Sequence, residues 1–158
     1  MMKLCSNVLK TLAGKTLVTA ESCTGGGIGA VLTAVPGSSE VYKGGIISYS
    51  NAVKHDMLGV SLDVLSTYGA VSEPVAIAMA DGARRLLSAD IAVSVTGLAG
   101  PGGDEFGHLV GTVYIGYSSA ERTFVKECYF KGDRESVRKQ TVETALKLIL
   151  ELEAQKTL

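Results

Sequence analysis

The sequence predicts an α/β fold, a single-domain three-layer α/β/α sandwich around a mixed β-sheet. Three observations predict it. Short segments rich in β-branched residues alternate with segments of helical periodicity through much of the chain. Two further alternating segments near the C-terminus follow each other directly, which predicts an antiparallel hairpin. A long final segment has helical spacing, so helices are available for both faces of the sheet.

The N-terminal half opens with apolar side chains at helical spacing over residues 1–13, followed by Gly14, so we expect a short helix that ends there. Residues 16–20 are short and β-branched, which is typical of a buried strand. We expect a helix over residues 25–34, and a second strand within residues 41–50 after a Pro-Gly turn.

Three helices are predicted next, two brief ones over residues 52–58 and 61–68 and a longer one that begins at Ser72 and runs to about residue 88. Ser72 is the expected N-cap, because an acid and a proline follow it. Residues 90–96 form the most apolar predicted strand of the chain.

The C-terminal part predicts a hairpin of residues 110–117 and 122–130, and then a helix that Asp133 caps and that extends to about residue 154. The strands separated by helices can lie parallel in the centre of the sheet, and the hairpin adds antiparallel strands. We found no linker or repeat, and therefore expect one domain over residues 1–158.

Composition narrows the classes of function. Hydrophobic residues make up 46% of the chain and charged residues 20%, an ordinary globular balance. A net charge of −1 gives no electrostatic reason to expect nucleic acid or an anionic membrane as a partner. No apolar run approaches the roughly 18 residues of a membrane span, and the N-terminus lacks the pattern of a signal peptide. We therefore expect a cytoplasmic protein.

Cysteine and histidine are scarce and scattered. The three cysteines, Cys5, Cys23 and Cys128, are widely spaced, which favours reduced thiols over a disulfide framework or a zinc site. With only His55 and His108 available, we expect no metal centre.

The most informative stretch is residues 15–29, in which a strand, a polar turn, a glycine-rich segment and a helix follow one another. This arrangement points backbone N–H groups at an anion or a developing negative charge. Ser22 lies in the turn, and we interpret it as a nucleophile, with Cys23 as a weaker alternative. Equally, the glycines can serve only helix–strand packing and the serine only a helix cap. Neither nucleotide-binding glycine motif nor the Gly-x-Ser-x-Gly elbow is present.

Three loops should converge on one edge of the sheet, because ligands in such folds bind beyond the carboxyl ends of the parallel strands. They follow residues 16–20, 41–50 and 90–96. A serine needs a base, and Lys54, helped by Tyr49 across a strand-to-helix turn, is our candidate. His55 has no recognisable partner acid and His108 lies in a polar loop, so we interpret both as surface or packing residues.

Arg134 and Arg138 lie four residues apart at the start of the last predicted helix, and therefore on one face. Cations at this end oppose the helix dipole, so their presence favours an anionic ligand such as phosphate. The alternative is a pair of surface ion pairs with the neighbouring acids Asp133 and Glu135.

Several segments together resemble the CinA C-terminal domain family, whose stand-alone form is nicotinamide-nucleotide amidase. The resemblance covers residues 7–152, nearly the whole chain. The matching segments, in order, are Glu21–Gly26, Tyr49–Lys54, Leu58–Val60, Gly69–Ser72, Thr96–Pro101 and Gly132–Arg134 with Arg138.

The resemblance implies hydrolysis of the carboxamide of nicotinamide mononucleotide (NMN) to nicotinate mononucleotide and ammonia, in pyridine nucleotide recycling. It implies an α/β/α sandwich, no metal or organic cofactor, and catalytic roles for Ser22, Tyr49 and Lys54. The substrate-binding residues that we predict are Cys23, Thr24, Gly25, Gly26, Asn51, Thr96, Gly97, Gly100, Arg134 and Arg138.

Two other functions remain open at this stage, a domain that binds a nucleotide or a protein partner without turnover, and an amidase for another small amide. Two departures from the family pattern bear on the choice. The glycine run after Thr24 is richer than expected, and His108 stands where we expect a lysine. Many family members also carry an N-terminal domain whose properties do not transfer. We expect a small-molecule substrate and self-association into a homo-oligomer.

Overall fold

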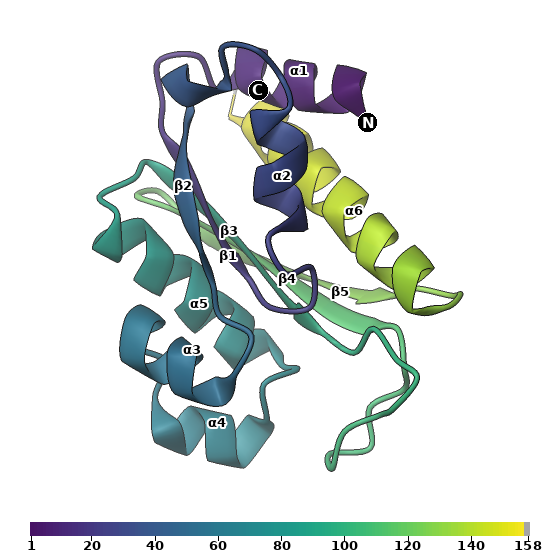
Figure 1. Ribbon diagram of the computed structural model, residues 1–158. Coiled ribbons are helices and arrows are strands. Elements are labelled where there is room, and N and C mark those ends of the chain that lie inside the picture. Colours follow the sequence, from purple (N-terminus) through teal and green to yellow (C-terminus); the bar gives the residue numbers. More distant parts are fainter. Residues whose placement is uncertain (157–158) are drawn as a thin grey trace.

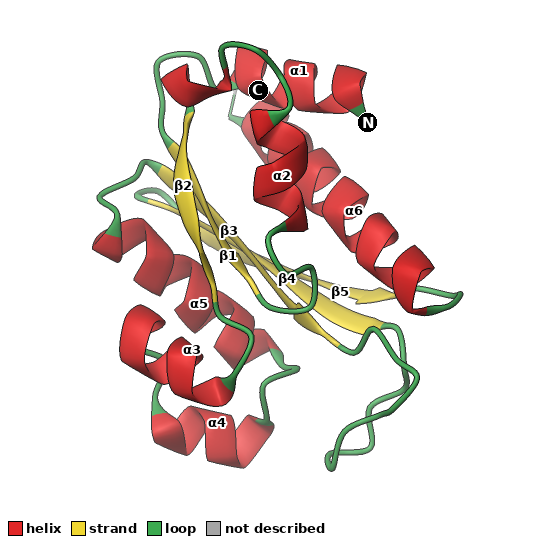
Figure 2. Ribbon diagram, viewed as in Figure 1, coloured by secondary structure: helices red, strands yellow, loops and turns green. Residues whose placement is uncertain are grey.

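The computed structural model describes residues 1–156; residues 157 and 158, the last two of the predicted domain, lie outside the description. The described chain forms one five-stranded mixed sheet with helices on both faces, which confirms the predicted fold class (Figure 1, Figure 2). The strands are β1 (Leu17–Glu21), β2 (Tyr42–Ile47), β3 (Ile91–Gly97), β4 (Thr112–Ser119) and β5 (Thr123–Tyr129). The helices are α1 (Met2–Thr11), α2 (Gly27–Thr33), α3 (Asn51–Leu58), α4 (Leu62–Tyr68), α5 (Glu73–Leu86) and α6 (Arg134–Gln155), with a 3₁₀ turn η1 (Ser38–Glu40).

The sheet has the strand order β2-β1-β3-β4-β5. Strand β1 pairs in parallel with β2 and β3, whereas β4 pairs antiparallel with both β3 and β5. The carboxyl ends of β1, β2 and β3 therefore lie at the same edge of the sheet, as the sequence predicted.

Two hydrophobic cores separate the three layers. One lies between the sheet and α1, α2 and α6, and includes Leu17, Ile28 and Leu146. The other lies between the sheet and α3, α4 and α5, and includes Val18 and Met79. Neighbouring residues of β1 enter opposite cores because successive side chains of a strand point to opposite faces.

Glycines allow the second layer to pack closely. A Cβ atom at Gly82 in α5 would collide with the carbonyl oxygen of Leu58 at the end of α3. A Cβ atom at Gly116 in β4 would lie 2.6 Å from the Ala76 carbonyl oxygen of α5. Helix α5 thus lies against both the sheet and α3, which places the start of α3 beside the carboxyl edge of the sheet (Figure 1).

Several element boundaries differ from the sequence-based expectation, and two of these differences shape the functional edge. Helix α2 begins at Gly27 rather than residue 25, because Gly25 and Gly26 have left-handed backbones with φ of 59° and 99°. Strand β2 ends at Ile47 rather than residue 50. The chain then turns, and the Ser50 hydroxyl accepts a hydrogen bond from Val53 N–H at 3.2 Å as the N-cap of α3.

No helix in residues 1–156 is long and apolar enough to cross a membrane. All three cysteines are free and buried.

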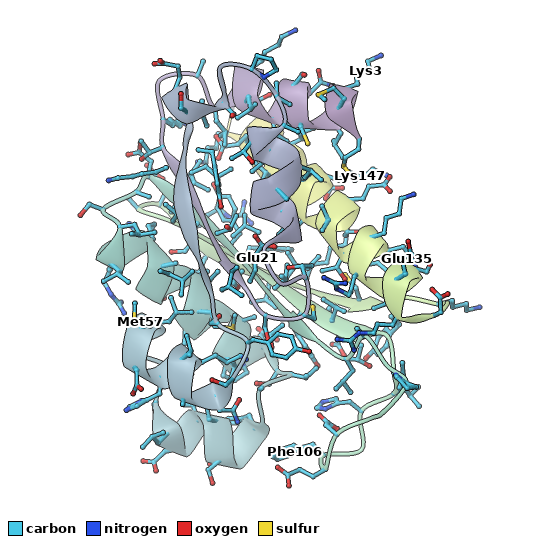
Figure 3. All side chains as sticks on the ribbon, in the orientation of Figure 1. Lys3, Glu21, Met57, Phe106, Glu135 and Lys147 are labelled. Carbon is cyan, nitrogen blue, oxygen red and sulfur yellow. The ribbon has the colours of Figure 1, made fainter. Side chains whose placement is uncertain are left out.

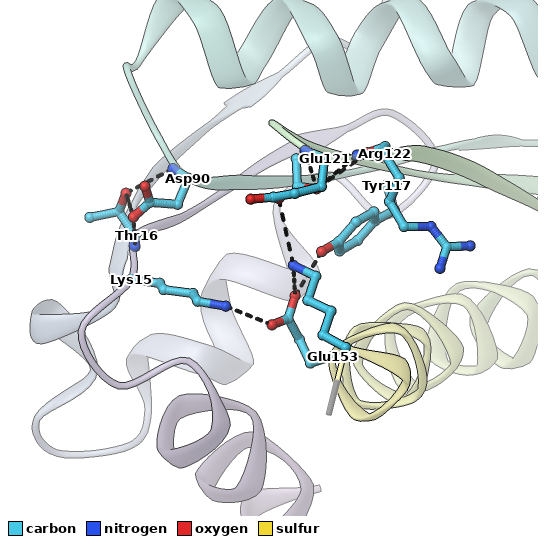
Figure 4. Close-up of polar contacts among 9 residues, drawn as sticks. Lys15, Thr16, Asp90, Tyr117, Glu121, Arg122 and Glu153 are labelled. Carbon is cyan, nitrogen blue, oxygen red and sulfur yellow. Dashed lines mark hydrogen bonds and ion pairs between the residues drawn. The ribbon is translucent and has the colours of Figure 1, made fainter. Parts of the chain in front are cut away.

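The buried carboxylate of Glu153 links the end of α6 to the amino edge of the sheet through hydrogen bonds (Figure 4). The Glu153 side chain is 4% exposed. It accepts hydrogen bonds from the Tyr117 hydroxyl at 2.7 Å, from Lys156 Nζ at 2.9 Å and from Lys15 Nζ at 3.0 Å. Burial by itself raises the pKa of Glu153, but the hydrogen bonds from these three donors outweigh it and hold the pKa below its usual value.

We expect Glu153→Gln to lower the free energy of unfolding by about 1–3 kcal/mol at pH 7, because the buried donors lose their charged acceptor. The depressed pKa of Glu153 means that its contribution is present above the unfolded-state pKa of 4.5 and is lost as pH falls through the folded-state value. Urea unfolding at pH 7 and in acid measures both effects. Equal free energies of unfolding for the wild type and Glu153→Gln at pH 7 would contradict the prediction. The matched control is Glu151→Gln, which makes the same substitution at an exposed position of the same helix.

Candidate active site

A cavity of about 660 Å³ opens at the carboxyl edge of β1 and β3, where the loops after β1, β2 and β3 meet. The start of α6 closes one side of it, and the turn between α4 and α5 closes another. The predicted site residues that line it are Ser22, Cys23, Tyr49, Asn51, Lys54, Thr96, Gly97, Gly100 and Arg134. Residues from four separate segments of the sequence are thus brought together.

Ser22 and Lys54 form the central contact. Lys54 Nζ lies 3.0 Å from Ser22 Oγ, and both side chains are buried, with residue exposures of 1% for Lys54 and 8% for Ser22. The Lys54 amine also donates to the carbonyl oxygens of Ser48 at 2.9 Å and Tyr49 at 3.5 Å. No carboxylate of the described residues forms an ion pair with this amine.

Burial lowers the pKa of Lys54 to about 8, because the charged ammonium is less well solvated in the protein than in water. A substantial fraction of this amine is therefore neutral near physiological pH. A neutral amine keeps two N–H bonds, which match the two carbonyl oxygens, and turns its lone pair toward Ser22 Oγ. This geometry allows Lys54 to remove the proton of the serine hydroxyl.

The turn that carries Ser22 is held from within by Glu21, whose side chain lies below the start of α2 (Figure 3). This buried carboxylate accepts hydrogen bonds from the Thr24 hydroxyl at 2.6 Å and from the N–H groups of Ile28 at 2.8 Å and Gly29 at 3.0 Å. A negative charge at the beginning of α2 also complements the helix dipole. Glu21 thus acts as the cap of α2 and orders the turn.

Cys23 follows the serine and also faces the cavity. Burial raises the pKa of the Cys23 thiol to about 12, so it stays protonated at neutral pH and is a poor nucleophile. Within residues 1–156, the N–H groups of Cys23 and Thr24 donate to no other residue, whereas Gly25 N–H donates to Ser22 O at 3.0 Å. Two backbone donors beside Ser22 are therefore free to face an oxyanion.

Tyr49 is placed differently from our expectation. We expected its hydroxyl to assist Lys54 at Ser22, but that hydroxyl accepts a hydrogen bond from Arg134 Nη2 at 3.1 Å at the cavity mouth. The ring is 62% exposed, because the chain turns outward after β2. Only the backbone carbonyl of Tyr49 contacts Lys54. Arg134 Nη1 also donates to the Gly100 carbonyl oxygen at 2.8 Å, which joins α6 to the loop after β3.

Arg138 is the second departure. It lies on the same face of α6 as Arg134, as predicted, but it does not line the cavity. Its guanidinium donates instead to the carbonyl oxygens of Cys23 at 3.1 Å and Thr24 at 3.2 Å. We expected a phosphate ligand; in the structure Nε and Nη2 of Arg138 donate to the serine turn, and Nη1 has no hydrogen-bond partner among residues 1–156. Thr24, Gly25 and Gly26 also lie outside the cavity lining, and they form the turn behind Ser22.

The wall opposite Ser22 comes from residues that we did not assign to the site. They belong to the end of α4, the α4–α5 turn and the long loop between β3 and β4: Leu65, Gly69, Ala70, Val71, Leu98, Ala99, Gly102, Asp104, Glu105 and Phe106. The Thr96 hydroxyl ties two of these segments together by donating to the Ala70 carbonyl oxygen at 2.8 Å. The glycines at the start of the β3–β4 loop could have indicated that this loop belongs to the site. No sequence pattern marks the acidic residues that follow, Asp104 and Glu105.

The two histidines do not face the reacting groups. His55 Nδ1 lies 2.8 Å from the Val60 carbonyl oxygen, and His108 Nδ1 lies 2.6 Å from Asp104 Oδ2. Neither residue lines the cavity. In residues 1–156, no group of three or more His, Cys, Asp and Glu side chains is arranged to hold a metal ion.

Comparison with known proteins identifies a family. A model described as the CinA C-terminal domain matches residues 1–152. A CinA-like protein of Mycolicibacterium gilvum is 46% identical over 143 residues, which cover 90% of this chain and 34% of that protein. A CinA-like protein of Prochlorococcus marinus is 58% identical over 102 residues, or 65% of this chain and 24% of that protein. This chain therefore spans only about a quarter to a third of these curated relatives.

Solved structures agree over almost the full length. A CinA superfamily protein of Klebsiella pneumoniae superposes with a TM-score of 0.95 at 35% identity, covering 98% of both chains. A CinA superfamily protein of Escherichia coli gives a TM-score of 0.94 at 35% identity, covering 96% of this chain and 89% of that one. These names state no reaction or substrate.

We expect the side-chain amine of Lys54 to titrate with a midpoint near pH 8, as the burial-lowered pKa requires. Heteronuclear NMR of the lysine side chains over a pH series measures this midpoint, with Lys54→Met identifying the resonance. The Ser22→Ala variant should retain a lowered pKa, because burial rather than the serine hydroxyl is the main cause. A midpoint close to 10.5 would contradict this account of the site.

Proposed function

This chain belongs to the CinA C-terminal domain family, and we propose that it hydrolyses the carboxamide of NMN to nicotinate mononucleotide and ammonia. The observation that carries the proposal is the buried contact of 3.0 Å between Lys54 Nζ and Ser22 Oγ. A purely structural serine needs no buried amine with a lowered pKa beside it, whereas an attacking serine needs a base.

The proposed reaction begins when neutral Lys54 accepts the Ser22 proton and Ser22 Oγ attacks the amide carbon. The N–H groups of Cys23 and Thr24 stabilise the oxyanion of the tetrahedral intermediate. Lys54 then returns the proton to the departing nitrogen, the C–N bond breaks and ammonia leaves. A water molecule, activated by the same amine, hydrolyses the acyl-enzyme and releases Ser22. One proton carrier serves both halves of the reaction, which needs no cofactor.

The cavity suits a mononucleotide in size and charge. A volume of about 660 Å³ lies within the usual range for small-molecule sites. Arg134 stands at the mouth with a planar guanidinium, the group best suited to a phosphate. Its present partners, the Tyr49 hydroxyl and the Gly100 carbonyl, are neutral acceptors that an anion can displace or join. Asn51 and the loop from Thr96 supply polar groups between these ends.

Two further proposals concern the setting of the reaction. The three free, buried cysteines support a cytoplasmic location, where thiols stay reduced. Exposed apolar side chains, such as Ile47 at 57% and Leu109 at 74%, support self-association.

The decisive experiment measures ammonia release from NMN by purified protein in the presence of a chelator. We expect turnover by the wild type, and a loss of at least about a thousandfold in Ser22→Ala and Lys54→Met, because the nucleophile or its base is removed. The exposed Ser39→Ala, far from the cavity, should retain full activity. Full activity in Ser22→Ala would refute the mechanism.

The same assay separates the alternatives. No turnover of NMN by folded wild-type protein, but turnover of another small amide, would identify an amidase of different specificity. Binding of NMN without any ammonia release would indicate a binding domain.

The two arginines should differ in kinetics. We expect Arg134→Ala mainly to raise KM for NMN, by about tenfold or more, because a charged contact with the phosphate is lost. Arg138→Ala should mainly lower kcat, because the turn that carries Ser22 loses the guanidinium that holds its carbonyls. Steady-state kinetics of both variants measures the changes in kcat and in KM separately. A rise in KM alone for Arg138→Ala would restore its predicted role as a substrate ligand.

A further inference from the structure

We propose that Glu105 is a specificity-determining residue that selects substrates whose carboxamide-bearing ring carries a positive charge. The inference rests on the proposed function, since it concerns the same cavity and the same reaction. It adds a residue that recognises the ring of the substrate. In the proposed function, Arg134 binds the phosphate and Ser22 attacks the amide.

Asp104 builds the turn that presents Glu105. Its carboxylate accepts hydrogen bonds from the N–H groups of Phe106 at 3.2 Å and His108 at 3.0 Å. Its second oxygen lies 2.6 Å from His108 Nδ1. All of these contacts lie within one short segment, residues 104–108, so the carboxylate of Asp104 is engaged in ordering its own loop.

Phe106 anchors the same segment against Gly69, at the end of α4. Its ring packs on Gly69 so closely that a Cβ atom there would lie 2.6 Å from two ring carbons. In Figure 3, Phe106 lies at the tip of the loop between β3 and β4, on the side of α4. The ring is 41% exposed and contributes to the cavity lining. The loop is thus tied at its tip as well as through its own hydrogen bonds.

Between these two anchors, Glu105 lines the cavity, and its carboxylate has no hydrogen-bond or ion-pair partner among residues 1–156. The charged groups elsewhere in the lining are all engaged. Asp104 holds its loop, Lys54 contacts Ser22, and Arg134 contacts Tyr49 and Gly100. The loop between β3 and β4 therefore adds to the cavity lining one solvent-exposed carboxylate that has no partner among the described residues.

A ligand that pairs with both the carboxylate of Glu105 and the guanidinium of Arg134 must carry charges of both signs. NMN does so, because its pyridinium ring is positive and its phosphate negative. With the amide at Ser22 and the phosphate toward Arg134, the ring lies in the cavity that Glu105 and Phe106 face. A carboxylate attracts the ring charge directly, and the face of an aromatic ring attracts a cation as well. Neutral amides of the same shape lack this attraction.

The test compares NMN with its 1,4-dihydro form, whose ring is uncharged while the ribose phosphate and carboxamide are retained. We expect Glu105→Gln to lower kcat/KM for NMN about fivefold and to leave the dihydro substrate within about twofold, since the substitution removes charge and little else. The measured quantity is the ratio of kcat/KM for NMN to kcat/KM for the dihydro form, compared between the wild type and the variant. Intrinsic differences in the reactivity of the two amides cancel in this comparison.

Two variants serve as controls. Glu151→Gln makes the same substitution at an exposed position of α6 that lies outside the cavity lining, and should leave the ratio unchanged. Asp104→Asn weakens the loop itself and should lower kcat/KM for both substrates together. An unchanged ratio in Glu105→Gln, with both substrates turned over, would overturn the inference and leave the proposed function intact.

Calorimetric binding of both compounds separates failure of the inference from failure of the proposed function. Absence of ammonia release from NMN would refute the proposed function. In that case, preferential weakening of NMN binding in Glu105→Gln would still support charge selection. Equal weakening, or no binding of either compound to the wild type, would overturn the inference.

Discussion

The site depends on burying a single lysine amine beside a serine. A buried ammonium is costly in free energy, and the cost falls when the amine is neutral, so burial itself supplies the base. The protein compensates with two backbone carbonyls from the turn after β2, at Ser48 and Tyr49, rather than with a carboxylate. A carboxylate in that place would stabilise the ammonium and raise the pKa of Lys54. Less of the amine would then be neutral near physiological pH. Helix α3, capped by Ser50, holds Lys54 above these carbonyls.

The charged residues around Ser22 support the backbone as well as the ligand site. Glu21 caps α2 from inside the turn, and Arg138 holds the carbonyls of the same turn from α6. Both groups satisfy backbone atoms that a tight, glycine-rich turn leaves without partners. Because the turn is fixed from both sides, the backbone at Cys23 and Thr24 is held in place, as the proposed oxyanion role of their N–H groups requires. Such preorganisation is the main way in which a protein stabilises developing charge.

Sequence reasoning predicted the fold and the meeting of three loops at one edge of the sheet, because both follow from local patterns. Strands β1 and β3 are buried on both faces, and the glycines after them mark where the chain leaves the sheet. The direction of single side chains was harder to predict. Tyr49 and Lys54 are equally compatible with facing Ser22 until the end of β2 is known, and that end depends on pairing with β1. The backbone contacts of Arg138 were also not predictable, because its acceptors are carbonyls, which every residue has.

The position of Tyr49 links the two ends of the cavity. Its backbone carbonyl contacts the amine of Lys54, and its hydroxyl contacts the guanidinium of Arg134. A phosphate that draws Arg134 toward itself therefore acts on the same residue that helps to hold the base. The turn after β2 is short and is bounded by the strand and by the N-cap of α3, so little of such a displacement can be absorbed elsewhere. In the proposed reaction, a substrate with a phosphate engages both contacts of Tyr49, whereas a simple amide engages only the amine. Under the proposed function, this link through Tyr49 favours a mononucleotide over its isolated base for a reason separate from binding strength.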